Sequence, residues 1–227
     1  MLPVVMTQCV YGIDIDPVAV DLARAACWLE TGGALSPSAM DDNIIVGDPL
    51  AGDMPKRLED RLAADPDPLT ILGNPPYRDK AAGAAPWIEE RRTAEQDELI
   101  PRPSMDEFRV PGQGRLEYSL ANLATFFWRW AAWKALETRE WAGTVAFISP
   151  SAYLQSRAYA GMRQHLRRVA EEGWVIDLSP EGRQPPVETR LFPGVQTQLA
   201  LGVFTTHYRA ARAGQPPREP AAPEAET

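Results

Sequence analysis

The sequence predicts an α/β fold, a doubly wound and mostly parallel sheet with an antiparallel hairpin at its C-terminal edge. Short apolar runs typical of buried strands recur at 10–16, 43–50 and 69–72. Each run ends at an acidic residue or a proline-rich turn, and helical segments lie between the runs. Because the carboxyl ends of parallel strands share one edge of such a sheet, we expect a functional site along that edge.

The overall composition predicts one soluble, cytoplasmic globular protein. The chain has 227 residues, 44% of them hydrophobic. No apolar run reaches roughly 18 residues, the length that a membrane-spanning helix needs. The first residues lack the basic and small-residue pattern of a secretory signal. A net charge of −8 argues against a chain that grips nucleic acid through its overall charge, although local basic contacts stay open.

The cysteines and histidines predict no metal site. Cys9 and Cys27 lack the spacing of metal ligands, and neither His165 nor His207 is near a cysteine or a carboxylate pair in the sequence. A zinc site and a Ser-His-Asp triad are therefore disfavoured. We expect both thiols to be free and buried in a reducing compartment.

The first strand, predicted at 10–16, runs into a helix at 18–30. Asp16 is the expected helix cap, and Pro17 suits the first helical position. An acidic residue at the carboxyl end of a parallel strand can bind the hydroxyls of a ribose, and Asp14 is the candidate for that role. The alternative is that Asp14 or Asp16 only caps the helix.

The second strand, predicted at 43–50, also ends in an acidic residue, Asp48. A carboxylate there can accept a hydrogen bond from an exocyclic amine such as that of an adenine ring. A strand followed by Gly-Asp is not specific by itself. A helix is expected at 56–64 before the third strand.

The third strand stops at Gly73 and the loop Asn74-Pro75-Pro76-Tyr77. The two prolines fix φ and donate no backbone hydrogen bond, so this loop is rigid. It combines an amide oxygen, backbone carbonyls and one aromatic ring, which together can receive a planar group that bears an amino donor. The alternative is an ordinary strand-ending turn, in which Asn and Pro are common.

The stretch 78–118 breaks the alternation, because it is rich in charge, Pro and Gly and has no sustained period. A loop of this length is either functional or disordered. We therefore expect a lid or substrate-contacting insertion or, equally, a disordered surface insert. Residues 209–227 are rich in Pro, Ala and Glu and predict a disordered tail.

The second half of the chain predicts the remaining layers of the fold. An aromatic helix at 120–137 is expected in the core, followed by a strand at 144–148 and a helix at 156–172 whose arginines form a solvated face. No helix fits between the last two predicted strands, 174–178 and 198–204, so we expect an antiparallel pair.

In this order the segments resemble the adenine-specific, amino-group DNA methyltransferases that use S-adenosylmethionine. Gly12–Pro17 resembles the family's second motif, Gly47–Leu50 its third and Asn74–Tyr77 its catalytic fourth. The aromatic helix and the strand after it resemble the fifth and sixth motifs, and Phe192-Pro193-Gly194 resembles the eighth. The resemblance implies a Rossmann-like catalytic core over residues 1–208.

The resemblance also implies residue roles in cofactor binding. S-Adenosylmethionine is expected to lie against Asp14, Ile15, Asp48 and Pro49, with Asp14 at the ribose hydroxyls and Asp48 at the adenine amino group.

The catalytic residues implied by the resemblance are Asn74, Pro75, Pro76 and Tyr77. The side-chain oxygen of Asn74 and the backbone carbonyl of Pro75 would accept hydrogen bonds from the amino group of a flipped adenine, and Tyr77 and Phe192 would stack on that base.

Two parts of the family pattern are not found. The Gly-rich first motif is expected before Gly12, where only Met1–Cys9 stands, and no target-recognition domain follows the eighth motif. The expected protein is thus a core truncated at its N-terminus, acting on DNA in restriction-modification or phage defence with a separate or missing recognition domain. No membrane or metal partner is expected.

Two other functions remain open. Methyltransferases that act on a protein glutamine amide or on guanine in ribosomal RNA also use an Asn-Pro-Pro-Tyr loop. The long insert after Tyr77 and the hairpin at Phe192 favour DNA. The second alternative is a remnant or subunit that binds DNA or a partner without catalysis.

Overall fold

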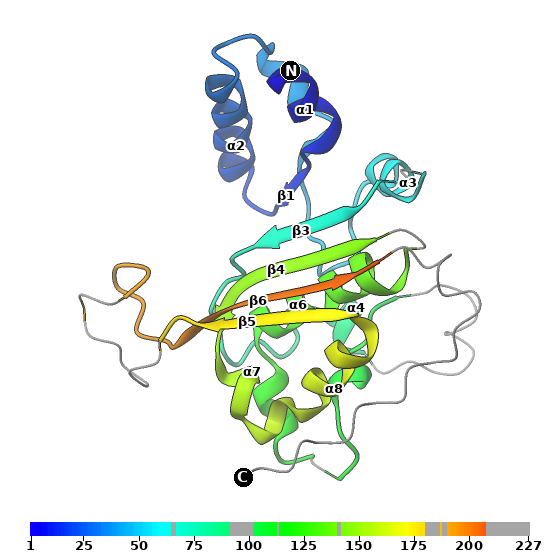
Figure 1. Ribbon diagram of the computed structural model, residues 1–227, viewed down its shortest axis with the longest axis vertical. Coiled ribbons are helices and arrows are strands. Elements are labelled where there is room, and N and C mark those ends of the chain that lie inside the picture. The colour runs from blue at the N-terminus through cyan, green and yellow to red at the C-terminus, as the bar shows by residue number, and fades with distance from the viewer. Residues whose placement is uncertain are drawn as a thin grey trace. The chain divides into compact units, whose positions relative to one another are not determined.

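The computed structural model describes residues 1–64, 67–90, 102–112, 114–139, 142–179, 187 and 190–207. The chain divides into two compact units, Met1–Asp65 and Pro66–Thr227. Strands and helices are present in both, so the α/β class is confirmed (Figure 1). The predicted tail at 209–227 lies outside the described residues. No helix in the part of the chain that the structure describes is long and apolar enough to cross a membrane.

The first unit is built on a small parallel sheet. Strands β1 and β2 pair in parallel, from Gly12 opposite Ile44 to Asp14 opposite Val46. The elements of this unit are α1 (Leu2–Cys9), β1 (Gly12–Asp14), α2 (Pro17–Glu30), η1 (Pro37–Met40), β2 (Ile44–Val46) and α3 (Lys56–Ala64).

Helix α2 begins as the sequence predicts. The Asp16 side chain accepts a hydrogen bond from Val18 N at 2.9 Å, and Pro17 occupies the first turn. One face of the helix is buried through Val20, which packs with Met40 and Ile44. The cap role of Asp16 is therefore confirmed.

The two thiols differ from the prediction. Cys27 is half-buried against the apolar cluster of the first unit, but Cys9 is exposed. Helix α1 has no buried residue among Leu2–Cys9, so an apolar sequence there does not place its thiol in a core. The expectation of two buried thiols is wrong for Cys9.

The second unit contains a mixed sheet of four strands in the order β3-β4-β6-β5. Its strands are β3 (Leu69–Gly73), β4 (Gly143–Pro150), β5 (Glu172–Asp177) and β6 (Leu199–Thr206). Strand β3 is parallel to β4, whereas β6 is antiparallel to both β4 and β5. The antiparallel pair predicted at the C-terminal edge is confirmed.

The described strands do not form the single doubly wound sheet that the sequence predicts. The described strands form a two-stranded and a four-stranded sheet. Apolar runs indicate that strands exist, but pairing depends on long-range contacts that no local pattern reports. Strand β3 was expected to be covered on both faces, yet Leu72 is 74% exposed.

The aromatic helix lies in the core, as predicted. It is divided into α6 (Leu123–Ala131) and a π-helical turn, η4 (Ala132–Glu137). The Trp128 ring meets Phe147 on β4 at 5.0 Å between centroids and Phe204 on β6 at 5.6 Å. Helix α6 is thereby fixed against the two central strands of the sheet.

The stretch 78–118 is largely part of the core where it is described. Ile88, Met105 and Phe108 are fully buried in the short elements α4 (Pro86–Glu89) and η2 (Met105–Phe108), and η3 (Glu117–Leu120) precedes α6. The expectation of a disordered surface insert is therefore wrong for these residues. Single turns of helix are too short to produce a detectable period. Residues 91–101 and 113 lie outside the described part.

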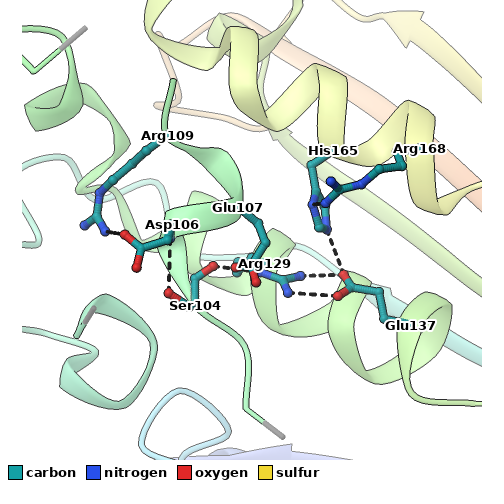
Figure 2. A network of polar contacts seen from close by, with 8 residues as sticks. All are labelled: Ser104, Asp106, Glu107, Arg109, Arg129, Glu137, His165 and Arg168. Atoms are coloured by element: carbon teal, nitrogen blue, oxygen red, sulfur yellow. Dashed lines mark hydrogen bonds and ion pairs between the residues drawn. The ribbon is translucent and has the colours of Figure 1, made fainter. Parts of the chain in front are cut away.

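A buried polar network ties η2, α6, η4 and α8 (Ala160–Val169) together (Figure 2). The Arg129 side chain is 1% exposed. Its Nη1 and Nη2 donate to the two carboxylate oxygens of Glu137 at 2.6 and 2.9 Å, and its Nε donates to Ser104 O at 2.9 Å. Glu137 Oε1 also lies 2.8 Å from His165 Nε2. This bidentate geometry compensates the burial of the guanidinium.

The hydrogen-bond donors around Glu137 and His165 determine which of these two side chains carries a proton. Burial alone would raise the pKa of Glu137, but hydrogen bonds from His165 and Arg129 outweigh it and lower that pKa to about 2. Burial lowers the pKa of His165. Arg168 lies 2.8 Å from His165 Nδ1 and can only donate, so Nδ1 accepts and Nε2 carries the proton toward Glu137.

The arginines of 156–172 were expected to form a solvated face, and this is wrong for Arg163, which is half-buried, whereas Arg157, Arg167 and Arg168 are exposed. Arg168 contacts His165, and Arg163 Nη1 donates to Tyr153 O at 2.7 Å and Ser156 O at 2.8 Å. The structure divides the predicted helix into η5 (Arg157–Tyr159) and α8, preceded by α7 (Ala152–Gln155). The two carbonyls that accept from Arg163 lie at these breaks in the helix.

Candidate functional site

Asp14 is the last residue of β1, and its side chain is exposed at the carboxyl end of the strand. Its Oδ1 accepts a hydrogen bond from Asp16 N at 2.8 Å, which closes a tight turn before α2. Oδ2 has no partner among the described residues. Ile15 follows with 69% of its surface exposed. Asp14 thus shapes the turn before α2, whereas Asp16 caps the helix, and Asp14 Oδ2 could still accept a hydrogen bond from a ligand.

Asp48 follows β2 at the same edge of the two-stranded sheet. Asp14 pairs with Val46, and Gly47 N donates to Asp14 O at 2.9 Å, so the two strand ends are adjacent. Asp48 Oδ1 accepts from Leu50 N at 2.9 Å, and Pro49 is buried beside it.

Gly47 is required by the close packing of this corner. A Cβ at Gly47 would lie 3.0 Å from Asp53 O and 3.1 Å from Ile13 Cδ1. A larger side chain would therefore push apart the two strand ends that carry Asp14 and Asp48.

The loop Asn74–Tyr77 leaves β3 at the carboxyl end of that strand. Asn74 and Pro76 are exposed, Pro75 is buried and Tyr77 is half-buried. Gly73 is needed just before the loop, because a Cβ there would lie 2.8 Å from Phe147 Cε1 on β4. The buried proline and the tight Gly73–Phe147 contact give the exposed amide a fixed base.

Tyr77 and Asn74 interact directly. The Tyr77 hydroxyl donates a hydrogen bond to Asn74 Oδ1. Burial raises the pKa of Tyr77, so its hydroxyl stays a neutral donor at physiological pH, although the bond to Asn74 acts in the opposite direction. An amide oxygen has two lone pairs, so Asn74 can still accept one further hydrogen bond.

Phe192 lies in the connection between β5 and β6 and is half-buried. Val195 N donates to Phe192 O at 3.2 Å, and Gly194 has a φ of 80°, which closes a tight turn. No ring contact joins Phe192 to Tyr77 within the described residues. The structure therefore brings Asn74 and Tyr77 together, and Asp14 and Asp48 together, but it does not seat Phe192 on Tyr77.

Sequence reasoning missed Asn122, which contacts the segment after the loop. Asn122 Nδ2 donates to Asp79 Oδ1 at 2.5 Å, and Asn122 Oδ1 caps α6. An Asn directly before an apolar helical run is a recognisable cap signal. Its link to Asp79, 43 residues earlier, has no local signature.

No cluster of His, Cys, Asp and Glu able to hold a metal ion exists among the residues that the structure describes. His207 does lie beside two carboxylates, with Nε2 at 3.7 Å from Glu171 and 3.5 Å from Glu172. The expectation that no carboxylate pair is near a histidine is wrong in space, because β-sheet pairing brings the ends of β5 and β6 together.

Comparison of the sequence with protein-family models and with curated proteins gives no match. Solved structures do match. A nuclease-deletion mutant of the Type ISP restriction-modification enzyme LlaGI, in complex with a DNA substrate mimic, has a TM-score of 0.65 at 16% identity over 90% of this chain. A DrdV–DNA complex has a TM-score of 0.58 at 20% identity over 89%. The ATP-dependent Type ISP restriction-modification enzyme LlaBIII bound to DNA has 0.57 at 16% identity over 90%.

These similarities establish a shared fold. At 16% to 20% identity, these similarities do not assign roles to individual residues of this chain. The chain spans only 20%, 20% and 14% of the three longer chains. The chain thus shares its fold with one segment of each of these longer chains.

Proposed function

We propose that the protein is an S-adenosylmethionine-dependent DNA methyltransferase that modifies the exocyclic amino group of a flipped-out adenine, in restriction-modification or phage defence. The observation that carries this proposal is the loop Asn74–Tyr77, which presents an exposed amide and a half-buried ring at the carboxyl end of β3. The fold shared with DNA-bound restriction-modification enzymes supports a DNA-related role in restriction-modification.

The chemistry requires hydrogen-bond acceptors rather than a strong base. The lone pair of an adenine amino group is delocalised into the ring, so the amine is a poor nucleophile. Asn74 Oδ1 and the Pro75 carbonyl would each accept a hydrogen bond from one of its N–H groups and draw the nitrogen toward a tetrahedral geometry. The rigid proline backbone fixes these acceptors before the base arrives, which is how positioning and electrostatics lower a barrier.

Base capture is the second task of this loop. Extrusion of a base from a duplex costs a few kcal/mol. Stacking on one aromatic ring contributes about 1–3 kcal/mol, and Tyr77 is the ring that the loop supplies. Phe192 is proposed as a second stacking face, in a turn that Gly194 closes.

The residues of the first unit fit the proposed cofactor. Bound S-adenosylmethionine would supply the methyl group from its sulfonium. Asp14 retains a carboxylate oxygen that can accept from ribose hydroxyls, and Ile15 offers an exposed apolar surface beside it. Asp48 keeps Oδ2 for an adenine amino group, next to the buried ring of Pro49.

We further propose that target recognition belongs to a separate domain. The net charge of −8 is unfavourable for gripping a polyanion through the surface of this chain. The similar restriction-modification enzymes LlaGI and LlaBIII are several times longer than the region that this chain covers.

Transfer of tritiated methyl groups tests the proposal. The protein is incubated with labelled S-adenosylmethionine and, in separate reactions, with unmethylated bacterial DNA, ribosomal RNA and peptide release factor. We expect label in DNA, lost in Asn74→Ala and retained in Gln8→Ala, which removes an exposed amide side chain from α1. Label only in RNA or in protein would refute the assignment to DNA.

A further inference from the structure

Asn122 is nearly fully buried, at 4% exposure, and uses both ends of its side chain. Its Oδ1 accepts from Ala124 N at 2.9 Å and from Thr125 N at 3.4 Å, which caps the start of α6. Its Nδ2 donates to Asp79 Oδ1 at 2.5 Å. One side chain therefore joins the start of a core helix to a residue two positions after Tyr77.

Backbone hydrogen bonds flank this contact on both sides. Leu123 N donates to Arg78 O at 3.1 Å, and Ala81 N donates to Ala121 O at 2.8 Å. The segment that follows Tyr77 is thus held along the N-terminal end of α6 by two backbone bonds with the Asn122–Asp79 bond between them.

The held segment contains backbone strain. Lys80, between Asp79 and Ala81, has a φ of 54° and is the only non-glycine residue with positive φ among the described residues. Such a conformation is unfavourable for an L-residue and persists where surrounding contacts fix it. The bonds to Ala121, Asn122 and Leu123 are the contacts that fix it here.

Helix α6 is a rigid reference for this segment. Trp128 Nε1 donates to Ser149 Oγ on β4 at 2.9 Å, and the Trp128 ring packs against Phe147 on the same strand. The start of α6 therefore cannot shift easily relative to β4.

From these contacts we propose that Asn122 is a positioning residue for the Asn74–Tyr77 loop. It transmits the rigidity of α6 through Asp79 and Arg78 to Tyr77, and thereby sets where the aromatic ring and the Asn74 oxygen are presented. This role rests on the proposed function for its catalytic consequence, but the clamp itself is a property of the free protein.

A reciprocal exchange isolates the clamp from the helix cap. In Asn122→Asp a carboxylate still accepts from Ala124 N, but the amide donor is lost and two carboxylates face each other. In Asn122→Asp combined with Asp79→Asn, donor and acceptor have simply changed places. Asn122→Ser keeps a good helix cap but is too short to reach Asp79, and serves as a second variant.

Amide hydrogen exchange of the free protein is the first measurement. We expect the amides of Ala81 and Leu123 to exchange about tenfold faster or more in Asn122→Asp and Asn122→Ser, since a hydrogen bond to a charged group is lost. The double variant should return to within about twofold of the wild type. Unchanged exchange in Asn122→Ser, or no recovery in the double variant, would overturn the proposal.

Methyl transfer to DNA is the second measurement. We expect kcat to fall about tenfold in Asn122→Asp with the KM for S-adenosylmethionine unchanged, and to recover in the double variant. A wild type that transfers no label while the exchange data show the clamp would refute the proposed function and leave the clamp intact. An altered KM for the cofactor with unchanged kcat would overturn the positioning role.

Discussion

The substitution Glu137→Gln perturbs the buried network at its centre. Glu137 accepts hydrogen bonds from both terminal nitrogens of Arg129 and from Nε2 of His165, while Arg129 is almost completely buried (Figure 2). Gln has the shape of a protonated Glu, so the substitution removes the charge and leaves the packing. Arg129 then keeps only the Glu107 carboxylate, at 3.3 Å, as a charged partner.

The pKa of Glu137 gives the expected magnitude. A pKa of about 2 in the folded protein, against an ordinary value of 4.5, corresponds to about 3 kcal/mol of stability at neutral pH. Because the folded pKa is depressed, this stability is present above pH 4.5 and is lost as the pH falls toward 2. The free-energy difference between the wild type and Glu137→Gln should therefore be about 3 kcal/mol at neutral pH and shrink steadily in acid.

Urea unfolding followed by tryptophan fluorescence measures this difference at neutral pH and in acid. Glu90→Gln is the matched control, because Glu90 is 68% exposed and 3.8 Å from Arg102. Because the Glu90 carboxylate is exposed and its contact with Arg102 is long, this pair should be worth less than about 1 kcal/mol. A loss of stability in Glu137→Gln no larger than in the control, or one independent of pH, would refute the reasoning.

Two further substitutions test the loop. In steady-state transfer assays, Tyr77→Ala should lower kcat/KM for DNA by the factor that corresponds to about 1–3 kcal/mol of lost stacking energy. Tyr77→Phe keeps the ring and frees Asn74 Oδ1, so its kcat/KM should stay near that of the wild type. A severe defect in Tyr77→Phe would show that the hydroxyl is needed. Gly73→Ala forces a Cβ to within 2.8 Å of the Phe147 ring and should cost about 1–3 kcal/mol in urea unfolding. Gly83→Ala, where no atom lies within 4 Å but φ is 81°, separates backbone strain from this clash.

Local signals in the sequence predict the parts of the fold that depend on neighbouring residues. Asp16 and Pro17 mark the start of α2 because a cap and a fixed φ act within one turn. The apolar runs mark β1, β2 and β3, although the observed strands are shorter at β1 and β2. The loop Asn74–Tyr77 is evident because two prolines must end a strand.

Other features depend on partners far away in the sequence. Arg129 lies in an aromatic helix, and nothing in its surroundings predicts a bidentate contact with Glu137 across a π-helical turn. The burial of Ile88 and Phe108 likewise follows from tertiary packing of single helical turns. Asp79 shows no signal of its link to Asn122, since 43 residues separate them. Such contacts are selected by the whole fold.

Nucleoside mass spectrometry of DNA treated with the protein and S-adenosylmethionine tests the central claim most directly. The claim is that Asn74 accepts a hydrogen bond from the amino group of a target adenine. The account predicts N6-methyldeoxyadenosine with the wild type and with Gln8→Ala, and its loss with Asn74→Ala while cofactor affinity stays unchanged by calorimetry. Near-normal formation of N6-methyldeoxyadenosine by Asn74→Ala would contradict it.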